Sequence, residues 1–225
     1  MRSNNHQKER HALRGVIEEE VRQTAHFSGL RHLDAHVLDA IERVPRERFV
    51  PEYEVDSAYA NVPLPIGYRQ TISQPFIVAL MTDLLEPEPD DVVLEIGTGS
   101  GYQAAVLAGL VSQVYSVEVV PELAEQAAAR LAELGYANVV TRAGDGNLGW
   151  PEHGPYDGII VTAAAPAVPP ALLAQLKPGA RLVIPVRVDG NGQVLRCITR
   201  DAGGRVHARD VLPVAFVPLI GGMPD

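Results

Sequence analysis

The middle of the chain alternates short apolar runs with amphipathic segments. Residues 92–96 (VVLEI) are apolar at four of five positions, include two β-branched valines and show no helical period, which is typical of a buried strand. The alanine-rich segment 104–110 follows and consists of good helix formers. The same patterns predict strands over 113–118, 138–142, 156–162 and 181–186, and helices over 121–134 and 170–176. This alternation predicts a parallel sheet covered by helices.

The two ends of the chain are patterned differently. Residues 1–9 are polar enough to be disordered, and apolar residues at helical spacing predict an amphipathic helix from Lys8 to Phe27. A second helix is expected to begin after Asp34, a good N-cap, and to end before Pro45. Towards the other end, strands are expected over 193–199 and over 206–217, the second broken at Pro213. The strands here follow one another directly, without intervening helices.

The segment 58–75 is rich in proline, yet it is apolar and aromatic rather than linker-like. Its prolines exclude long regular structure, so an irregular segment held against the rest of the protein is expected. It could form a lid or cleft wall, or it could be a rigid connector packed on the core; the pattern alone does not decide. Ser73 fits the N-cap of a helix over 75–85, with Pro75 in its first turn, and capping alone would explain this serine.

Composition narrows the class of protein. A chain of 225 residues with 46% hydrophobic residues fits a single domain with one continuous core. One cysteine excludes a disulfide scaffold, and Cys197 lies in a predicted strand, where a buried structural thiol is expected. A polar N-terminus and the absence of a membrane-length apolar run predict a cytoplasmic protein without membrane association.

Charge and histidine spacing argue against two kinds of ligand. The formal net charge of −9 argues against nucleic acid as a partner, because binding to phosphates needs concentrated Lys and Arg. His32 and His36 stand four residues apart, but no third ligand follows at a suitable spacing, so no metal site is expected.

Three glycines at alternate positions follow the central apolar run. A nicotinamide or flavin fold is expected to show G-x-G-x-x-G. Here Gly97, Gly99 and Gly101 place the third glycine one residue early, and the acid Glu95 precedes the first. This pattern resembles motif I of the class I S-adenosylmethionine-dependent methyltransferases. Their ligand carries a sulfonium and an ammonium and no phosphate, so a nearby carboxylate suits it better than a bare anion hole.

Two further acids follow predicted strands. Glu118 ends the strand over 113–118, about 20 residues after the first glycine, where a carboxylate can hold both hydroxyls of a ribose. Without the glycine turn it would be read as an ordinary charged strand end. Asp145 lies between two glycines after the next strand; it can approach the exocyclic amine of an adenine, although Asp-Gly is also a common turn pair. After the following strand, the small residues 163–166 leave room for a ligand.

The order of segments resembles one family in particular, the protein-L-isoaspartate (D-aspartate) O-methyltransferases, over roughly residues 10–220. The segments that carry the resemblance are 44–51 (VPRERFVP), 64–67 (LPIG), 70–75 (QTISQP), the glycine turn, 144–146 (GDG), 163–166 (AAAP), 176–179 (LKPG) and 216–219 (FVPL). The resemblance implies a class I methyltransferase fold, that is, a Rossmann-like doubly wound sheet, with N-terminal helices and a strand-rich C-terminal end. One domain is expected over 1–225, with the N-terminal helices and substrate-cleft segment over 10–75, the cofactor-binding core over 76–186 and the C-terminal strands over 187–225.

The resemblance also implies roles for particular residues. Ser73 is expected to be the active-site serine. S-adenosylmethionine, which becomes S-adenosylhomocysteine, is expected to contact Thr71, Ile72, Glu95, Gly97, Thr98, Gly99, Gly101, Glu118, Asp145, Gly146 and Thr162. Two positions depart from the family pattern: Arg69 stands where a small residue is usual, and Asn61 where Asp is usual. Both are expected to flank the substrate cleft.

The implied activity is methyl transfer to the free carboxylate of isoaspartyl and D-aspartyl residues in damaged proteins. A monomer is expected. The ester is expected to cyclise without further catalysis, which starts repair. Two alternatives remain: a methyltransferase for an ordinary aspartate in one dedicated peptide, and a non-catalytic protein that binds S-adenosylmethionine.

Overall fold

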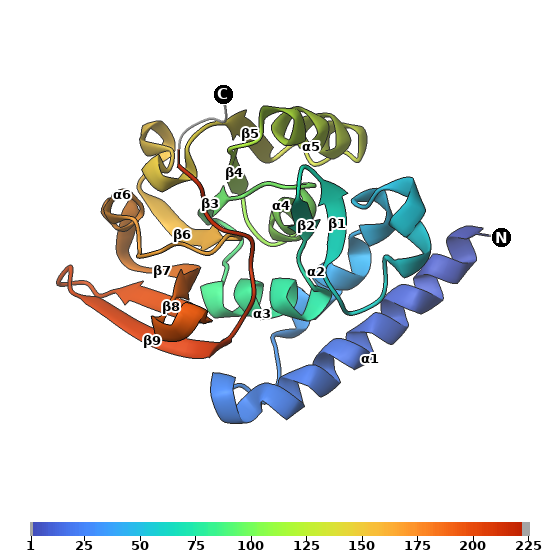
Figure 1. The fold of residues 1–225 in the computed structure, drawn as a ribbon, viewed down its shortest axis with the longest axis horizontal. Coiled ribbons are helices and arrows are strands. Elements are labelled where there is room, and N and C mark those ends of the chain that lie inside the picture. Colours follow the sequence, from blue (N-terminus) through green and yellow to red (C-terminus); the bar gives the residue numbers. More distant parts are fainter. Residues whose placement is uncertain (1, 222–225) are drawn as a thin grey trace.

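A seven-stranded sheet forms the centre of the molecule (Figure 1). The computed structural model describes residues 2–221, with side chains for 6–190 and 192–221. The strand order is β5-β4-β3-β6-β7-β8-β9. The strands are β3 (Val92–Ile96), β4 (Gln113–Glu118), β5 (Val139–Ala143), β6 (Tyr156–Val161), β7 (Leu176–Arg187), β8 (Gln193–Arg200) and β9 (Val206–Pro213).

The sheet is parallel from β5 to β7; β8 then pairs antiparallel with β7, and β9 pairs antiparallel with β8. The chain runs from β3 outwards to β4 and β5, then returns to place β6 on the other side of β3. This reversal of strand order next to β3 is the topological switch point at which open α/β sheets bind ligands, beyond the carboxyl ends of the strands. The expected doubly wound sheet is confirmed.

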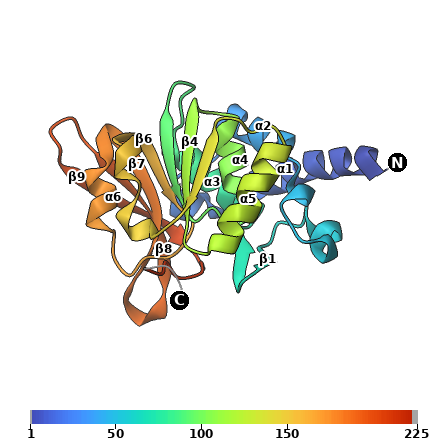
Figure 2. The same cartoon turned by 90° about the horizontal axis from the view of Figure 1, so that it is seen from above.

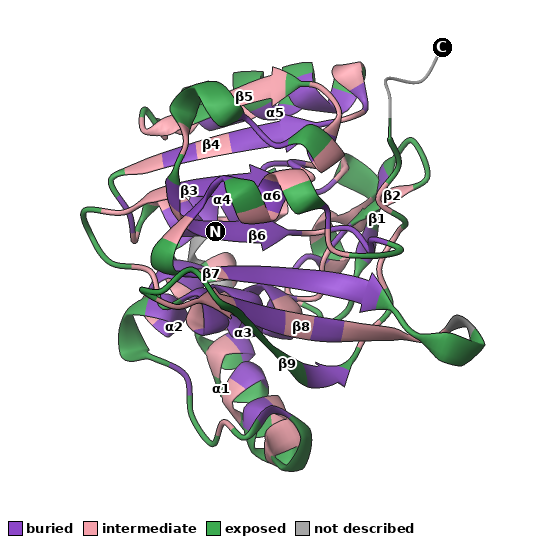
Figure 3. Ribbon diagram, turned by 90° about the vertical axis from the view of Figure 1, so that its left-hand side faces the viewer, coloured by how far each residue is buried: buried purple, intermediate pink, exposed green. Residues whose placement is uncertain are grey.

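Helices cover both faces of the sheet (Figure 2). One face of the sheet packs against a core to which α1, α2, α3, α4 and α5 contribute. The other face packs against α6 and Trp150. The helices are α1 (Arg2–Ser28), α2 (Ala35–Arg43), α3 (Pro75–Leu85), α4 (Tyr102–Ala108), α5 (Pro121–Glu133) and α6 (Pro170–Ala174). Figure 3 shows that β3, β4, β6 and β7 are mostly buried, as their apolar runs predict.

The N-terminal helix is longer than its pattern indicates. Disorder was expected over residues 1–9, but Arg2–Glu9 form the first turns of α1, while Met1 lies outside the described residues. The His6 ring accounts for part of this order, because it hydrogen-bonds Glu9 at 2.8 Å and packs on Tyr59 with ring centroids 5.8 Å apart. The tertiary contact with Tyr59 cannot be read from local polarity.

Two further segments differ from the sequence-based expectation. Part of the segment expected to be irregular forms an antiparallel hairpin, β1 (Leu64–Gly67) and β2 (Gln70–Ile72). The last predicted strand, 206–217, ends at Pro213, because proline has no N–H to continue a ladder. Residues 214–217 instead line a cleft, described below.

Across residues 2–221, no helix combines the length and apolar character that crossing a lipid bilayer requires.

Candidate functional site

The glycine turn follows β3 directly and has the backbone that only glycine adopts easily. Gly97, Gly99 and Gly101 have φ of +96°, +53° and +91°. A Cβ on Gly97 would collide with the hydroxyl of Thr162, at the end of β6. That hydroxyl donates hydrogen bonds to the carbonyls of Ile96 at 3.1 Å and Gly97 at 2.7 Å. Thr162 therefore fixes the start of the turn from the neighbouring strand.

Glu118 fixes the other side of the turn. Its Oε2 accepts the backbone N–H of Gly99 at 2.7 Å, and its Oε1 accepts that of Val120 at 3.0 Å. Only 5% of the residue is exposed. Two backbone donors hold this carboxylate at the end of β4, and each oxygen keeps capacity for a further donor.

A pocket lies beside the turn, at the carboxyl ends of β3, β4 and β6, and is the candidate cofactor pocket. Its lining includes Gly97, Gly99, Glu118, Gly146 and Thr162. The chain segment 217–220 and the start of β2 cover it. Glycine is required at 146, because a Cβ there would run into Ile96 at the end of β3.

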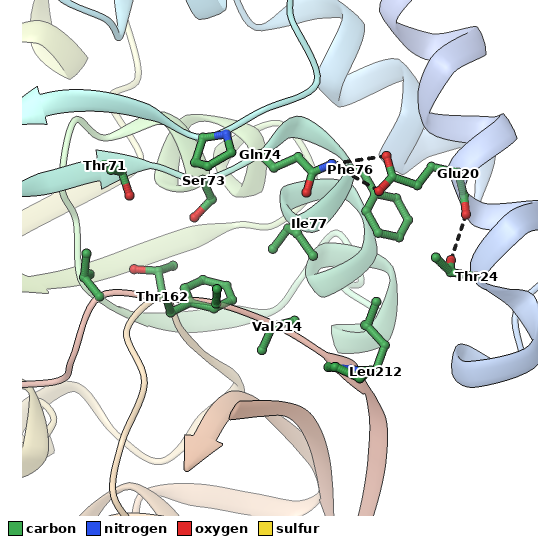
Figure 4. Close-up of a pocket in the computed structure, with 15 residues that line it drawn as sticks. Glu20, Thr24, Thr71, Ser73, Gln74, Phe76, Ile77, Thr162, Leu212 and Val214 are labelled. Carbon is green, nitrogen blue, oxygen red and sulfur yellow. Dashed lines mark hydrogen bonds between the residues drawn. The ribbon is translucent and has the colours of Figure 1, made fainter. Parts of the chain in front are cut away.

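A second cleft of about 490 Å³, the candidate substrate cleft, is also lined by Thr71 and Thr162 (Figure 4). Its walls come from α1, from the segment 71–77 and from residues 212–217. Thr71 and Thr162 line both the cleft and the cofactor pocket. A third, small cavity shares Thr71 and Thr162 with both spaces and is called the neck here. It is lined by Thr71, Ile72, Ser73, Val78, residues 97–100, Tyr102, Gln103 and Thr162.

Ser73 lines the cleft and the neck, and its hydroxyl has no hydrogen-bond partner in the part of the chain that the structure describes. The predicted capping role is wrong: Gln74 occupies the N-cap of α3 without a capping bond of its own, and the first-turn N–H of Phe76 is accepted by the Asn61 side chain instead. The serine hydroxyl is therefore available to a ligand in the cleft.

Arg46 fixes the backbone of Ser73 by a hydrogen bond. The sequence patterns did not predict this role. Arg46 is completely buried, its Nη2 donates to the Ser73 carbonyl at 2.8 Å, and its Nε donates to the Ala58 carbonyl at 2.9 Å. Its guanidinium lies 4.7 Å from the centre of the Tyr102 ring. The only signal in the sequence is its place in the family segment 44–51.

Glu95 does not reach the cofactor pocket, although it was expected to contact the cofactor. It is completely buried and accepts a hydrogen bond from the Ser116 hydroxyl, which lies 2.5 Å from that of Thr98. Burial raises the pKa of the Glu95 carboxyl to about 8. Glu95 therefore supports the turn from behind, through Ser116 and Thr98.

The other predicted residues are placed as follows. Thr98 is 3% exposed and lines the neck, as does Ile72. Gly101 is the N-cap of α4 and lines none of the three spaces, because it packs against Leu131 of α5. The Asp145 carboxylate accepts the Asn147 N–H at 2.8 Å and is not in the pocket lining, whereas its neighbour Gly146 is.

The two departures from the family pattern lie in different surroundings. Arg69 is exposed at the tip of the β1–β2 hairpin and is not among the residues that line either space. Asn61 touches the cleft through Glu20: its Nδ2 donates to the Glu20 carboxylate at 2.5 Å, and its Oδ1 accepts the Phe76 N–H at 2.9 Å. An ionised Asp at this position could not donate to Glu20.

This combination of a doubly wound sheet, a glycine turn and an acid at the end of β4 defines a class I methyltransferase fold. The family model for protein-L-isoaspartate (D-aspartate) O-methyltransferase matches residues 21–223. The chain belongs to that family.

Similar proteins and a solved structure carry the same family name. The chain is 57% identical over 206 residues to protein-L-isoaspartate O-methyltransferase 2 of Syntrophobacter fumaroxidans, covering 92% of this chain and 83% of the relative. It is 53% identical to the protein of the same name from Nitrosococcus oceani, covering 94% and 96%. A solved protein-L-isoaspartate O-methyltransferase superposes with a TM-score of 0.82 at 28% identity, covering 95% of this chain and 67% of that one.

A second solved structure shares the fold. It is a putative protein-L-isoaspartate O-methyltransferase from Plasmodium falciparum in complex with S-adenosyl-L-homocysteine. Its TM-score is 0.74 at 23% identity, covering 91% of this chain and 97% of that one.

Proposed function

We propose that this protein transfers a methyl group from S-adenosylmethionine to the free carboxylate of isoaspartyl, and also D-aspartyl, residues in damaged proteins. The observation that carries the proposal is the position of Ser73. Its unpartnered hydroxyl lies at the neck between a cleft large enough for a peptide segment and a pocket built on the glycine turn. Family membership supports the substrate class.

The residues around the cofactor pocket fit S-adenosylmethionine. Glu118 is fixed by two backbone donors and can still accept bonds from two ribose hydroxyls. Gly97, Gly99 and Gly146 leave the backbone accessible, and Thr71 and Thr162 border the side that faces the cleft. When bound there, the cofactor supplies a methyl group on a sulfonium leaving group. Glu95 makes no contact with the cofactor in this proposal, because it is completely buried.

The chain itself has three tasks: to orient the substrate carboxylate, to remove water from it and to exclude other nucleophiles. An isoaspartyl α-carboxylate has an intrinsic pKa of about 3.3 to 4, so it is ionised at neutral pH and no general base is needed. Ser73 donates a hydrogen bond that aims one carboxylate oxygen towards the neck. The apolar wall formed by Ile77, Leu212, Val214 and Phe216 excludes water around it.

Labelled methyl transfer tests the proposal. One peptide is prepared in isoaspartyl, D-aspartyl and L-aspartyl forms and incubated with the enzyme and labelled S-adenosylmethionine. We expect label in the isoaspartyl form, less in the D-aspartyl form and none in the L-aspartyl form. Transfer to the L-aspartyl form would favour a dedicated-peptide methyltransferase. Cofactor binding with no transfer to any form, or to aged protein, would favour a non-catalytic binding protein.

We also propose a cytoplasmic monomer that folds as one domain. One continuous core links α1, α3 and α4 to the sheet, which supports the single domain. Sedimentation, cell fractionation and a single calorimetric unfolding transition check these three points.

A further inference from the structure

The substrate cleft contains one charged side chain, Glu20 of α1; every other residue that lines it is neutral. The rest of the lining is threonine, serine, glutamine, proline and apolar residues. Figure 4 shows Glu20 joined to the segment that carries Ser73, because Gln74 reaches across to its carboxylate. The carboxylate therefore belongs to the same cavity as the serine.

Neutral amides hold this carboxylate in place. Gln74 Nε2 lies 3.1 Å from both Glu20 oxygens, and Asn61 Nδ2 lies 2.5 Å from Oε2. The backbone carbonyl of Glu20 accepts a bond from the Thr24 hydroxyl at 2.8 Å, which is within α1. Amide donors restrict the rotamer of a carboxylate without cancelling its charge.

No cation neutralises Glu20 within the described part of the chain. The neighbouring acids differ in this respect, because Glu19 is paired with Arg22 at 2.7 Å and Glu18 with Arg14 at 3.6 Å. The Glu20 carboxylate thus has no cationic partner and lies beside an apolar wall, where water screens charge less than on an open surface.

From this geometry we propose that Glu20 is a specificity-determining residue that selects the sequence around the damaged site. It favours isoaspartyl segments carrying a Lys or Arg near the isoaspartate and disfavours segments with Asp or Glu there. The inference rests on the proposed function, since it concerns the peptide that occupies the cleft. Asn61 contributes to the selectivity by holding Glu20 through an amide, where an Asp would add a second negative charge.

The alternative is that Glu20 only ties α1 to the segment 61–76 by hydrogen bonds. That role depends on the shape of the side chain and its acceptor oxygens, whereas selection depends on its charge. Glu20→Gln keeps the shape and one acceptor but removes the charge, so the two roles separate. Glu19→Gln is the matched control. It removes a charge of the same sign at the next position along the helix, and the Glu19 side chain is exposed and does not line the cleft.

The experiment uses isoaspartyl peptides that differ at one position, carrying Lys, Gln or Glu two residues after the isoaspartate, and a second set with the change two residues before it. For each peptide, kcat/KM is measured for methyl transfer. The Kd is measured separately in the presence of S-adenosylhomocysteine, where no transfer occurs. In the wild-type protein we expect the Lys peptide of at least one set to exceed the Glu peptide by about fivefold in both quantities, with a smaller ratio at high salt.

In Glu20→Gln the Lys-to-Glu ratio is expected to fall to about one, whatever the absolute rate, while Glu19→Gln keeps the wild-type ratio. A wild-type ratio of one in both peptide sets, or an unchanged ratio in Glu20→Gln, overturns the inference. A failure of the proposed function gives a different result. If that function is wrong, the Gln peptides receive no methyl group, whereas the ratio of Kd values for the Lys and Glu peptides still tests the role of Glu20.

Discussion

The guanidinium of Arg46 donates from Nη2 to the backbone carbonyl of Ser73 at 2.8 Å, from a completely buried position. Its Nε holds the Ala58 carbonyl at the same time, so a single side chain ties together three segments around the serine. In the described residues no carboxylate pairs with this buried cation; it is held by carbonyls and by the face of Tyr102. Burying such a charge is costly, and here it sets the position of Ser73.

Arg46→Lys should therefore misplace Ser73 without disturbing the cofactor pocket. An ammonium cannot reproduce the planar fork that reaches two carbonyls. We expect kcat for an isoaspartyl peptide to fall about tenfold or more, while the Kd of S-adenosylhomocysteine stays within about twofold. Steady-state kinetics and calorimetric titration measure the two quantities. Equal losses in both would show that Arg46 supports the whole fold and not the serine in particular.

Ser73→Ala removes the hydroxyl that orients the substrate. A hydrogen bond to a carboxylate contributes about 1.5–3 kcal/mol, so kcat/KM should fall about 10- to 100-fold. The melting temperature should change little, because this hydroxyl bonds to no described residue and does not cap α3. Wild-type turnover in the variant would remove Ser73 from the mechanism.

Glu118→Ala should weaken binding of S-adenosylhomocysteine by about 1–3 kcal/mol, because a carboxylate that accepts two ribose hydroxyls is lost. Calorimetric titration gives the Kd. Glu122→Ala is the control, since it removes an exposed acid from the first turn of α5. Thermal unfolding should accompany the titration, because Glu118 also holds the N–H groups of Gly99 and Val120. An unchanged Kd in Glu118→Ala would exclude the ribose role.

Two glycine substitutions should separate folding from binding. In Gly97→Ala the new Cβ meets the Thr162 hydroxyl at a φ of +96°, so we expect the free energy of unfolding to fall by about 1–3 kcal/mol. At Gly99 the φ is +53° and the nearest atom is the end of the Ile66 side chain, 3.3 Å from the new Cβ, so the fold should tolerate a substitution better. Gly99→Val places a β-branched side chain at this positive φ, so we expect it to abolish cofactor binding and to lower the free energy of unfolding by about 1–3 kcal/mol without unfolding the protein. Tight calorimetric binding by this variant would contradict the assignment of the turn.

Glu95 should make stability depend on pH. Burial raises the pKa of its carboxyl from 4.5 to about 8, so the folded protein keeps a proton that the unfolded chain releases. Its contribution to the free energy of unfolding is therefore intact below pH 4.5 and declines as the pH rises towards 8. Glu95→Gln removes this decline, so the variant should gain stability relative to the wild type as the pH rises through that interval. Thermal unfolding of both proteins at several pH values measures the difference, and a constant difference would mean that Glu95 does not titrate there.

The central strands, the glycine turn and the acid at the end of β4 follow from local sequence. A run such as Val92–Ile96 can bury both faces only inside a sheet, and glycine at 97, 99 and 101 allows positive φ at little cost, so strand, turn and helix are fixed within about ten residues. The end of β4 at Glu118 is equally local. Family membership was predicted from such segments, and the comparisons confirm it.

Tertiary structure alone decided which groups meet. Arg46 and Ser73 are 27 residues apart, and Glu20 and Gln74 are 54 apart, so no periodicity brings these pairs together. The sequence allowed Ser73 to cap a helix and Glu95 to face the cofactor; packing left the serine hydroxyl free and buried the acid against Ser116. Local patterns specify strands, turns and caps because they depend on neighbouring φ and ψ, whereas a cleft depends on how distant segments pack against each other.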